Sequence, residues 1–189
     1  MPPSEKETKQ SRIASALLDV VKKIIAQHEN LTFSKDPEIL ERDIIEYDSR
    51  LRVSGMEKFN APCYICLAAF YRSQQDLEAH NAIGAIILYI EEVNAERLFK
   101  GLGYRGFHDD NEGEMLEKSG EFLTSIVEQF KPELANLGYK NIVLSPLLKH
   151  INTIPEGVEF HYDEHKMHQL TFYLWKEKIF AIDITLASA

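Results

Sequence analysis

The sequence lacks several features that mark specialised classes of protein. Only two of its 189 residues are cysteine, so a disulfide framework is excluded and a reducing compartment is expected. No apolar run approaches the roughly 20 residues that a membrane helix requires. The first ten residues, MPPSEKETKQ, have no apolar segment of the kind found in signal peptides. We therefore expect a cytoplasmic protein that does not enter the membrane.

Positive charge is also scarce. The chain has 21 basic and 30 acidic residues and a formal net charge of -9. A nucleic-acid-binding protein needs a basic face that displaces counterions from phosphates, so such a partner is not expected. The 44% hydrophobic and 27% charged residues are ordinary globular values. The length suits one domain over residues 10–189, after a frayed tail at residues 1–9.

Apolar residues at three- and four-residue steps predict helices over residues 11–28 and 91–99. Asp36-Pro37 is typical of an N-cap followed by the first helical residue. A short helix is therefore predicted over residues 37–47, which makes residues 10–47 an N-terminal helical region beside a core at residues 50–187.

The strongest helical pattern begins near residue 112. Asp109, Asp110 or Asn111 can cap it, and Gly138 is a natural end. Pro132 should interrupt or kink this helix, because it lacks an amide hydrogen and clashes with the preceding turn. One arc of the helix is apolar, and the opposite arc carries Glu117, Glu121, Thr124, Glu128 and Lys131.

Strand-like segments occur in two groups, one on each side of the helices near the middle of the chain. The predicted strands cover residues 47–53, 63–71, 82–90, 141–145, 158–162, 169–175 and 180–186. Grouped strands favour antiparallel pairing, so the predicted fold class is α+β with a mainly antiparallel sheet flanked by helices. The strand at residues 180–186 could lie at a sheet edge, where its unpaired backbone groups would favour a homodimer.

Two short motifs have ordinary structural explanations. The segment from Gly101 to Gly106 spells a dinucleotide-binding pattern, but it follows a helix, whereas the mechanism requires it to follow a strand. A glycine C-cap and loop is the better interpretation. Cys63 and Cys66 lie three apart in a predicted strand and point to opposite faces, which favours two buried thiols over a redox or zinc half-site.

Histidines gather near the C-terminal end, at His161, His165 and His168. On a strand, His161, Asp163 and His165 would project from one face, which makes them the best metal-binding candidate in the chain. Solvated histidines in a hairpin are the alternative interpretation, and no metal or other cofactor is expected.

The segment around the helix at residue 112 resembles the chemotaxis phosphatase family, which includes CheC, CheX and FliY, and it resembles CheX most. In that family a solvent-facing helix carries an acidic residue or serine, then Glu four residues on, then Asn three residues later, with a proline roughly twenty residues beyond. The corresponding residues here are Glu117, Gly120-Glu121, Thr124 and Pro146. The lysine, leucine and Leu-Gly that commonly follow the family's Asn correspond to Lys131, Leu134 and Leu137-Gly138. Thr124 departs from the family's Asn, Glu117 stands in the Asp/Ser place, and the proline falls one residue short.

That resemblance implies a protein that docks on a phosphorylated CheY-type receiver domain and acts as an aspartyl-phosphate phosphatase. It assigns Glu121 to docking and a salt bridge, and Thr124 to the place that positions the attacking water. Glu117, Glu128 and Pro146 would contribute to receiver docking, and a homodimer is expected. Weak hydrolysis or none is predicted, because the threonine hydroxyl reaches about one bond less far than a carboxamide. The alternatives are a non-catalytic receiver-binding module, a metal-dependent hydrolase using His161, Asp163 and His165, or an ordinary solvated helix face.

Overall fold

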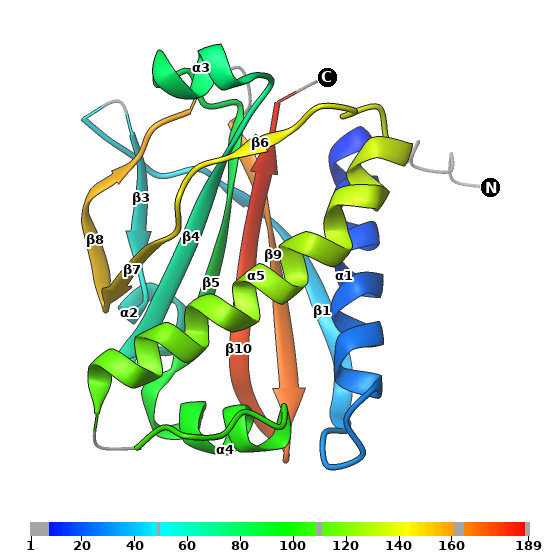
Figure 1. Cartoon of the computed structure of the whole chain (residues 1–189), viewed down its shortest axis with the longest axis vertical. Helices are drawn as coiled ribbons and strands as arrows, with labels where there is room; N and C mark the ends of the chain where they lie inside the picture. The colour runs from blue at the N-terminus through cyan, green and yellow to red at the C-terminus, as the bar shows by residue number, and fades with distance from the viewer. Residues whose placement is uncertain (1–7, 49, 109–110, 161–164, 188–189) are drawn as a thin grey trace.

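The computed structural model describes residues 8–48, 50–108, 111–160 and 165–187 (Figure 1). Within these residues the helices are α1 (Lys9–Ala26), α2 (Met56–Phe59), α3 (Gln74–Glu78), α4 (Glu92–Gly101) and α5 (Glu112–Asn136). The strands are β1 (Phe33–Asp43), β2 (Glu46–Tyr47), β3 (Arg50–Ser54), β4 (Cys63–Tyr71), β5 (Gly84–Glu91), β6 (Val143–Leu144), β7 (Leu148–Ile151), β8 (Thr153–Val158), β9 (Lys166–Leu174) and β10 (Glu177–Leu186).

The main sheet is antiparallel, with the strand order β1-β9-β10-β5-β4-β6, and β7 pairs with β4 beside β6. Helices α1, α4 and α5 cover one face, and α5 runs diagonally across the strands (Figure 1). A second sheet of order β2-β3-β8 contributes to the core on the other face. The predicted α+β class, with a mainly antiparallel sheet flanked by helices, is confirmed.

Alternate residues of each central strand enter different cores. On β4, Cys66 and Phe70 pack with the helices, whereas Cys63 and Leu67 pack with the small sheet. All nine residues of β4 are buried for this reason. β10 is likewise buried from Ile179 to Leu186, including the polar Asp183. A strand covered on both faces must place even its polar residues inside the protein.

The long helix follows its prediction closely. Asn111 is the N-cap of α5, and its side-chain oxygen accepts from the Glu114 amide at 3.2 Å, while Asp109 and Asp110 lie outside the described residues. The interruption expected at Pro132 is absent, because α5 continues through this residue to Asn136. Gly138 follows the helix with a φ of 103°, as expected of a residue that ends one.

The helix predicted over residues 37–47 is wrong. Residues 37–43 belong to β1, which pairs with β9, and residues 46–47 form β2. Pro37 lies where the register shifts between Lys35 and Glu38. β1 is the edge strand of the main sheet, where a proline is tolerated because one side of the strand needs no amide donor. The capping signal at Asp36-Pro37 was therefore overridden by pairing with a strand more than a hundred residues away.

Two expectations for the C-terminal part also need correction. The strand predicted at residues 158–162 ends at Val158 as β8, and residues 161–162 lie outside the described part. The strand at residues 180–186 is not at an edge, because β10 lies between β9 and β5. The argument for a homodimer through that strand therefore fails. Among the described residues, no helix is both long and apolar enough to cross a membrane.

Candidate functional site

Helix α5 has one side buried against the main sheet and the opposite side exposed. Its apolar side chains pack on the main sheet, where the Phe122 and Phe180 rings meet edge to face with centroids 5.4 Å apart. On the opposite side four residues are exposed, and we call them the acidic ridge: Glu117, Glu121, Thr124 and Glu128. They stand four, three and four residues apart, so they follow one line along the helix surface. The predicted outward orientation of Glu121 and Thr124 is thus present.

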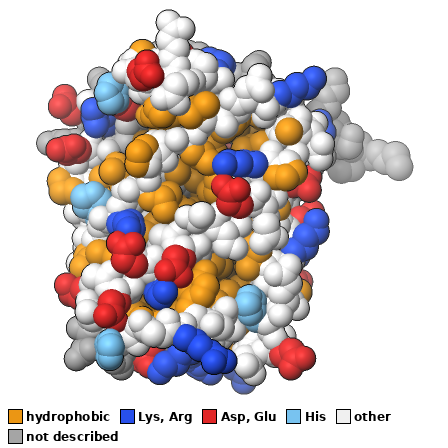
Figure 2. All heavy atoms as spheres, in the orientation of Figure 1, with side chains coloured by type: hydrophobic (Ala, Val, Ile, Leu, Met, Phe, Trp, Pro, Cys, Tyr) orange, Lys and Arg blue, Asp and Glu red, His pale blue; other side chains and the backbone are white. Residues whose placement is uncertain are grey.

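Each carboxylate of the acidic ridge has a lysine partner. Lys118 Nζ lies 2.8 Å from Glu121 Oε1, and Lys131 Nζ lies 2.9 Å from Glu128 Oε1. Lys149, on β7, pairs with Glu117. Figure 2 shows acidic and basic side chains interspersed over this face, with apolar side chains between them. The net charge of the ridge together with its lysine partners is therefore close to zero, although the ridge residues themselves are mostly acidic.

The Thr124 hydroxyl is turned onto its own helix. Its Oγ1 donates to the Gly120 carbonyl oxygen at 2.9 Å, the contact that threonine often makes inside helices. The hydroxyl hydrogen is therefore already used in a hydrogen bond, and only the lone pairs of Oγ1 remain for a partner outside the helix. Thr124 can accept a hydrogen bond from a water molecule, but it cannot donate one in this rotamer. This geometry limits what the residue can do beside Glu121.

Gly120 marks the place where α5 passes close to the segment that precedes and begins β7. A Cβ atom at Gly120 would lie 3.2 Å from Lys149 Cδ and 3.6 Å from Leu147 Cδ1. Pro146 is exposed and adjoins Leu147 in sequence, and Leu148 is 46% exposed. The structure thus brings the Pro146 segment to the flank of the acidic ridge, across more than twenty residues of sequence.

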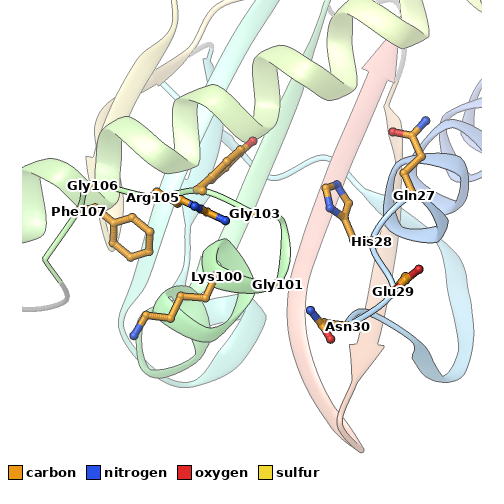
Figure 3. Close-up of a pocket in the computed structure, with 11 residues that line it drawn as sticks. Gln27, His28, Glu29, Asn30, Lys100, Gly101, Gly103, Arg105, Gly106 and Phe107 are labelled. Atoms are coloured by element: carbon orange, nitrogen blue, oxygen red, sulfur yellow. The ribbon is translucent and has the colours of Figure 1, made fainter.

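A cavity of about 600 Å³ lies between the turn after α1 and the loop after α4 (Figure 3). His28 and Asn30 border it on one side, and Lys100, Arg105 and Phe107 on the other. Gly101 is the last residue of α4, and residues 102–106 form the loop after it, where the Gly103 amide donates to the Lys100 carbonyl at 3.0 Å. The dinucleotide-binding pattern therefore follows a helix and forms its C-terminal end and the next loop, as predicted.

The same loop approaches α5 through Tyr104, which lies beside Lys118. The Tyr104 ring lies 5.9 Å from the ring of Phe99, and Lys118 Nζ lies 5.8 Å from the Tyr104 ring centroid. Burial, with a further contribution from the Glu121 charge, raises the pKa of Tyr104 to about 12. The phenol therefore stays neutral at ordinary pH. Sequence reasoning missed this residue, because no local pattern connects position 104 to position 118.

The other sequence candidates are not assembled into a site within the described residues. Cys63 and Cys66 enter different cores, and burial raises the pKa of each thiol to about 12, so neither is a reactive thiolate. His161 and Asp163 lie outside the described residues, while His165 is exposed and His168 is only 5% exposed. Among the residues described, no three His, Cys, Asp or Glu side chains group as a metal site.

One buried charged cluster was also missed. Lys58 Nζ lies 2.7 Å from Asp183 Oδ2, and it donates to Gln169 Oε1 at 3.0 Å. The Tyr89 hydroxyl donates to Asp183 at 3.1 Å. The cluster lies on the sheet face away from α5 and joins α2 to the main sheet. An aspartate inside an otherwise apolar strand, at position 183, was the signal that could have indicated it.

Comparisons with known proteins agree on the fold. No protein-family model and no curated protein matches the sequence. Among solved structures, FliY from Thermotoga maritima aligns with a TM-score of 0.55 and 11% identity, over 99% of this chain and 93% of that one. A CheC-like superfamily protein from Shewanella sp. PV-4 aligns with a TM-score of 0.52 and 16% identity, over 96% and 97%. A complex of CheX with CheY, BeF3 and Mg²⁺ from Borrelia burgdorferi aligns with a TM-score of 0.52 and 15% identity, over 97% and 100%. The chain therefore has the CheC/CheX-like fold.

Proposed function

We propose that this protein docks on the phosphorylated receiver domain of a CheY-type response regulator through the acidic ridge of α5. The observation that carries the proposal is the exposed pair of Glu121 and Thr124, one helical turn apart, on a chain with the CheC/CheX-like fold. Pro146 and its neighbours would extend the docking surface beside the ridge. The solved complex of CheX with CheY supports a partner of this class for the fold.

The ridge suits a helper of phosphoryl transfer better than an independent enzyme. A receiver domain already holds Mg²⁺ and its own lysine around the aspartyl phosphate. The docked partner has only to place a water in line with the phosphorus, because phosphoryl transfer depends mainly on positioning and charge stabilisation. Water attacks phosphorus, the bond to the aspartate oxygen breaks, and inorganic phosphate leaves. Glu121 would pair with the receiver lysine and orient the two proteins.

Thr124 limits the chemistry on this surface. A carboxamide offers a donor and an acceptor on one planar group, which can hold a water in a defined orientation. The Thr124 hydroxyl donates its hydrogen bond to the Gly120 carbonyl, and it reaches less far from the helix than a carboxamide would. We therefore propose receiver docking with slow hydrolysis, and a purely non-catalytic binding module is the second candidate, favoured by the same hydrogen bond.

Binding is tested by titrating the protein with a CheY-type receiver in the presence and absence of beryllofluoride and Mg²⁺, which mimic the phosphorylated state. The activated receiver should bind more tightly. Glu121→Ala should weaken binding at least about tenfold, the loss expected for one hydrogen bond to a charged group. Glu46→Ala is the matched control, because Glu46 is an exposed carboxylate on β2. Equal binding by the two variants would refute docking through the ridge.

Catalysis is tested separately, by phosphate release from a phosphorylated receiver. The wild-type protein should accelerate release only slightly. Thr124→Asn should raise the rate if docking already places position 124 near the phosphoryl group, whereas Thr124→Ser keeps the hydroxyl and should not. Rapid turnover by the wild-type protein would exclude the binding-module alternative.

A further inference from the structure

Lys118 contacts both a carboxylate and an aromatic ring, whereas Lys131, the other lysine of α5, pairs with Glu128. The Lys118 ammonium group contacts the Glu121 carboxylate at 2.8 Å, and it also lies 5.8 Å from the Tyr104 ring centroid. A cation within about 6 Å of an aromatic ring centroid is attracted by the ring quadrupole. The Lys118 side chain is only 20% exposed, compared with 42% for Lys131 in the parallel pair with Glu128.

The position of Tyr104 beside Lys118 is fixed by contacts with α4. The Tyr104 backbone amide donates to the Phe99 carbonyl at 2.9 Å, and its ring packs near the fully buried Phe99 ring. The loop after α4 therefore holds the ring in place beside α5. Glu121, by contrast, is 51% exposed and is free to meet another cation. The ammonium of Lys118 thus lies between a fixed ring and an accessible carboxylate.

A cation that approaches from outside reaches the more exposed Glu121 carboxylate, where it comes close to the Lys118 ammonium group. Two like charges at such a short distance repel each other, and they do so more strongly near a protein surface than in bulk water. The incoming group must therefore displace Lys118 from the carboxylate. The Tyr104 ring offers the displaced ammonium a place to remain, because the cation–π contact does not require Glu121.

We propose that Lys118 is a specificity-determining residue that competes with the receiver lysine for Glu121 and moves onto Tyr104 when the receiver docks. This inference rests on the proposed function, because it assumes that a partner's cation binds Glu121. Lys118 lowers the affinity for every partner that presents a cation. Only partners whose other contacts with the ridge offset this loss then bind stably, whereas a partner that offers a cation alone does not.

The first test measures the affinity of Lys118→Met for the beryllofluoride-activated receiver. Removing a helix ion pair and the like-charge repulsion should tighten binding about two- to tenfold. Lys35→Met is the matched control, because Lys35 also pairs with a glutamate, Glu38, and also lies over a tyrosine ring, at 4.6 Å from that of Tyr173. Lys35 is on the edge strand β1, so its substitution should leave the affinity unchanged.

The second test examines the role of Tyr104. Tyr104→Ala removes the alternative contact of Lys118 and should weaken receiver binding, whereas Tyr104→Phe keeps the ring and should bind like the wild-type protein. In the Lys118→Met background the Tyr104→Ala substitution should have no further effect, because there is no ammonium group to relocate. This loss of additivity distinguishes a coupled pair from two independent contacts.

The outcomes separate the two proposals. If neither the wild-type protein nor Lys118→Met binds the activated receiver, the proposed function itself is wrong. If the wild-type protein binds through Glu121 but Lys118→Met binds equally or more weakly, Lys118 is no competitor, and only the present inference is overturned. Lys118 is on the surface of α5, and methionine is as good a helix former as lysine. The Lys118→Met variant should therefore fold like the wild-type protein.

Discussion

The molecule contains two lysine–carboxylate pairs of nearly the same length in opposite surroundings. Lys58 and Asp183 approach to 2.7 Å with side chains 10% and 2% exposed. Lys118 and Glu121 approach to 2.8 Å with side chains 20% and 51% exposed. The buried pair has further partners in Gln169 and Tyr89 and cannot exchange them, whereas the carboxylate of the exposed pair can accept another cation.

The difference shows that distance alone does not reveal what an ion pair does. Breaking a buried pair leaves a charge without water or a counter-ion, which is strongly unfavourable. Breaking an exposed pair costs little, because water replaces the lost partner. In this protein the buried pair joins α2 to the sheet, and the exposed pair lies where we propose a partner binds. The buried pair and the proposed docking site therefore use the same chemistry on opposite faces of one sheet.

The largest effect is expected when one member of the buried pair is removed. Lys58→Met should lower the free energy of unfolding by about 3–5 kcal/mol, because the Asp183 carboxylate is left buried without its cation. Urea denaturation measures this loss. A change below about 1 kcal/mol would contradict a structural role for the pair, because exposed ion pairs contribute no more than that to the free energy of unfolding.

A smaller effect of the opposite sign is expected at Gly120. Gly120→Ala should raise the free energy of unfolding by about 0.5–1 kcal/mol, because glycine is unfavourable inside helices. The new methyl group would press on the Lys149 alkyl chain, which is flexible, and should loosen the pair with Glu117. Thermal unfolding measures the gain, and the Lys149→Ala background removes the contact. Destabilisation in both backgrounds would show that Leu147, not Lys149, resists the substitution.

The pH dependence of stability reports on a further buried group, His168. Burial lowers the pKa of His168, and the Glu41 charge opposes this shift only in part. Because the neutral imidazole is favoured in the folded state, its contribution is complete above about pH 6.5. It is lost as the pH falls from there through the lowered value. His168→Gln should flatten the pH profile of unfolding in this range.

The smallest effect is expected for the exposed pair between Lys131 and Glu128. Lys131→Met should change the free energy of unfolding by less than about 0.5 kcal/mol, since exposed helix pairs contribute little and are screened by salt. The same denaturation experiment that measures Lys58→Met provides the comparison. Similar losses for the two variants would remove the distinction between the buried and exposed pairs.

The elements that were predicted well are those whose pattern is local. The apolar arc of α5, its Asn111 cap and the apolar runs of β4 and β5 follow from neighbouring residues alone. Residues 37–47 were misassigned because the same Asp36-Pro37 pair suits a helix start and an edge strand. The choice was made by β9, whose pairing with β1 no local pattern reveals.

The candidate site divides in the same way. Helical periodicity was sufficient to put Glu117, Glu121, Thr124 and Glu128 on one exposed ridge. It could not reveal that Lys149 pairs with Glu117, that the Thr124 hydroxyl bonds to Gly120, or that Tyr104 lies beside Lys118. These contacts depend on side-chain rotamers and on chain segments that meet only after folding.

The sequence by itself determined which surface of α5 faces water, because a helix has a fixed period and apolar residues leave water wherever they can. Only the tertiary structure decided which lysine–carboxylate pair is buried with fixed partners and which is exposed and can exchange its partner. Asp183 and Glu121 are chemically similar carboxylates, each with a lysine, and the layers packed around them exclude water from one and admit it to the other. That difference in hydration arises from the assembled sheet and helices, and no short stretch of sequence contains it.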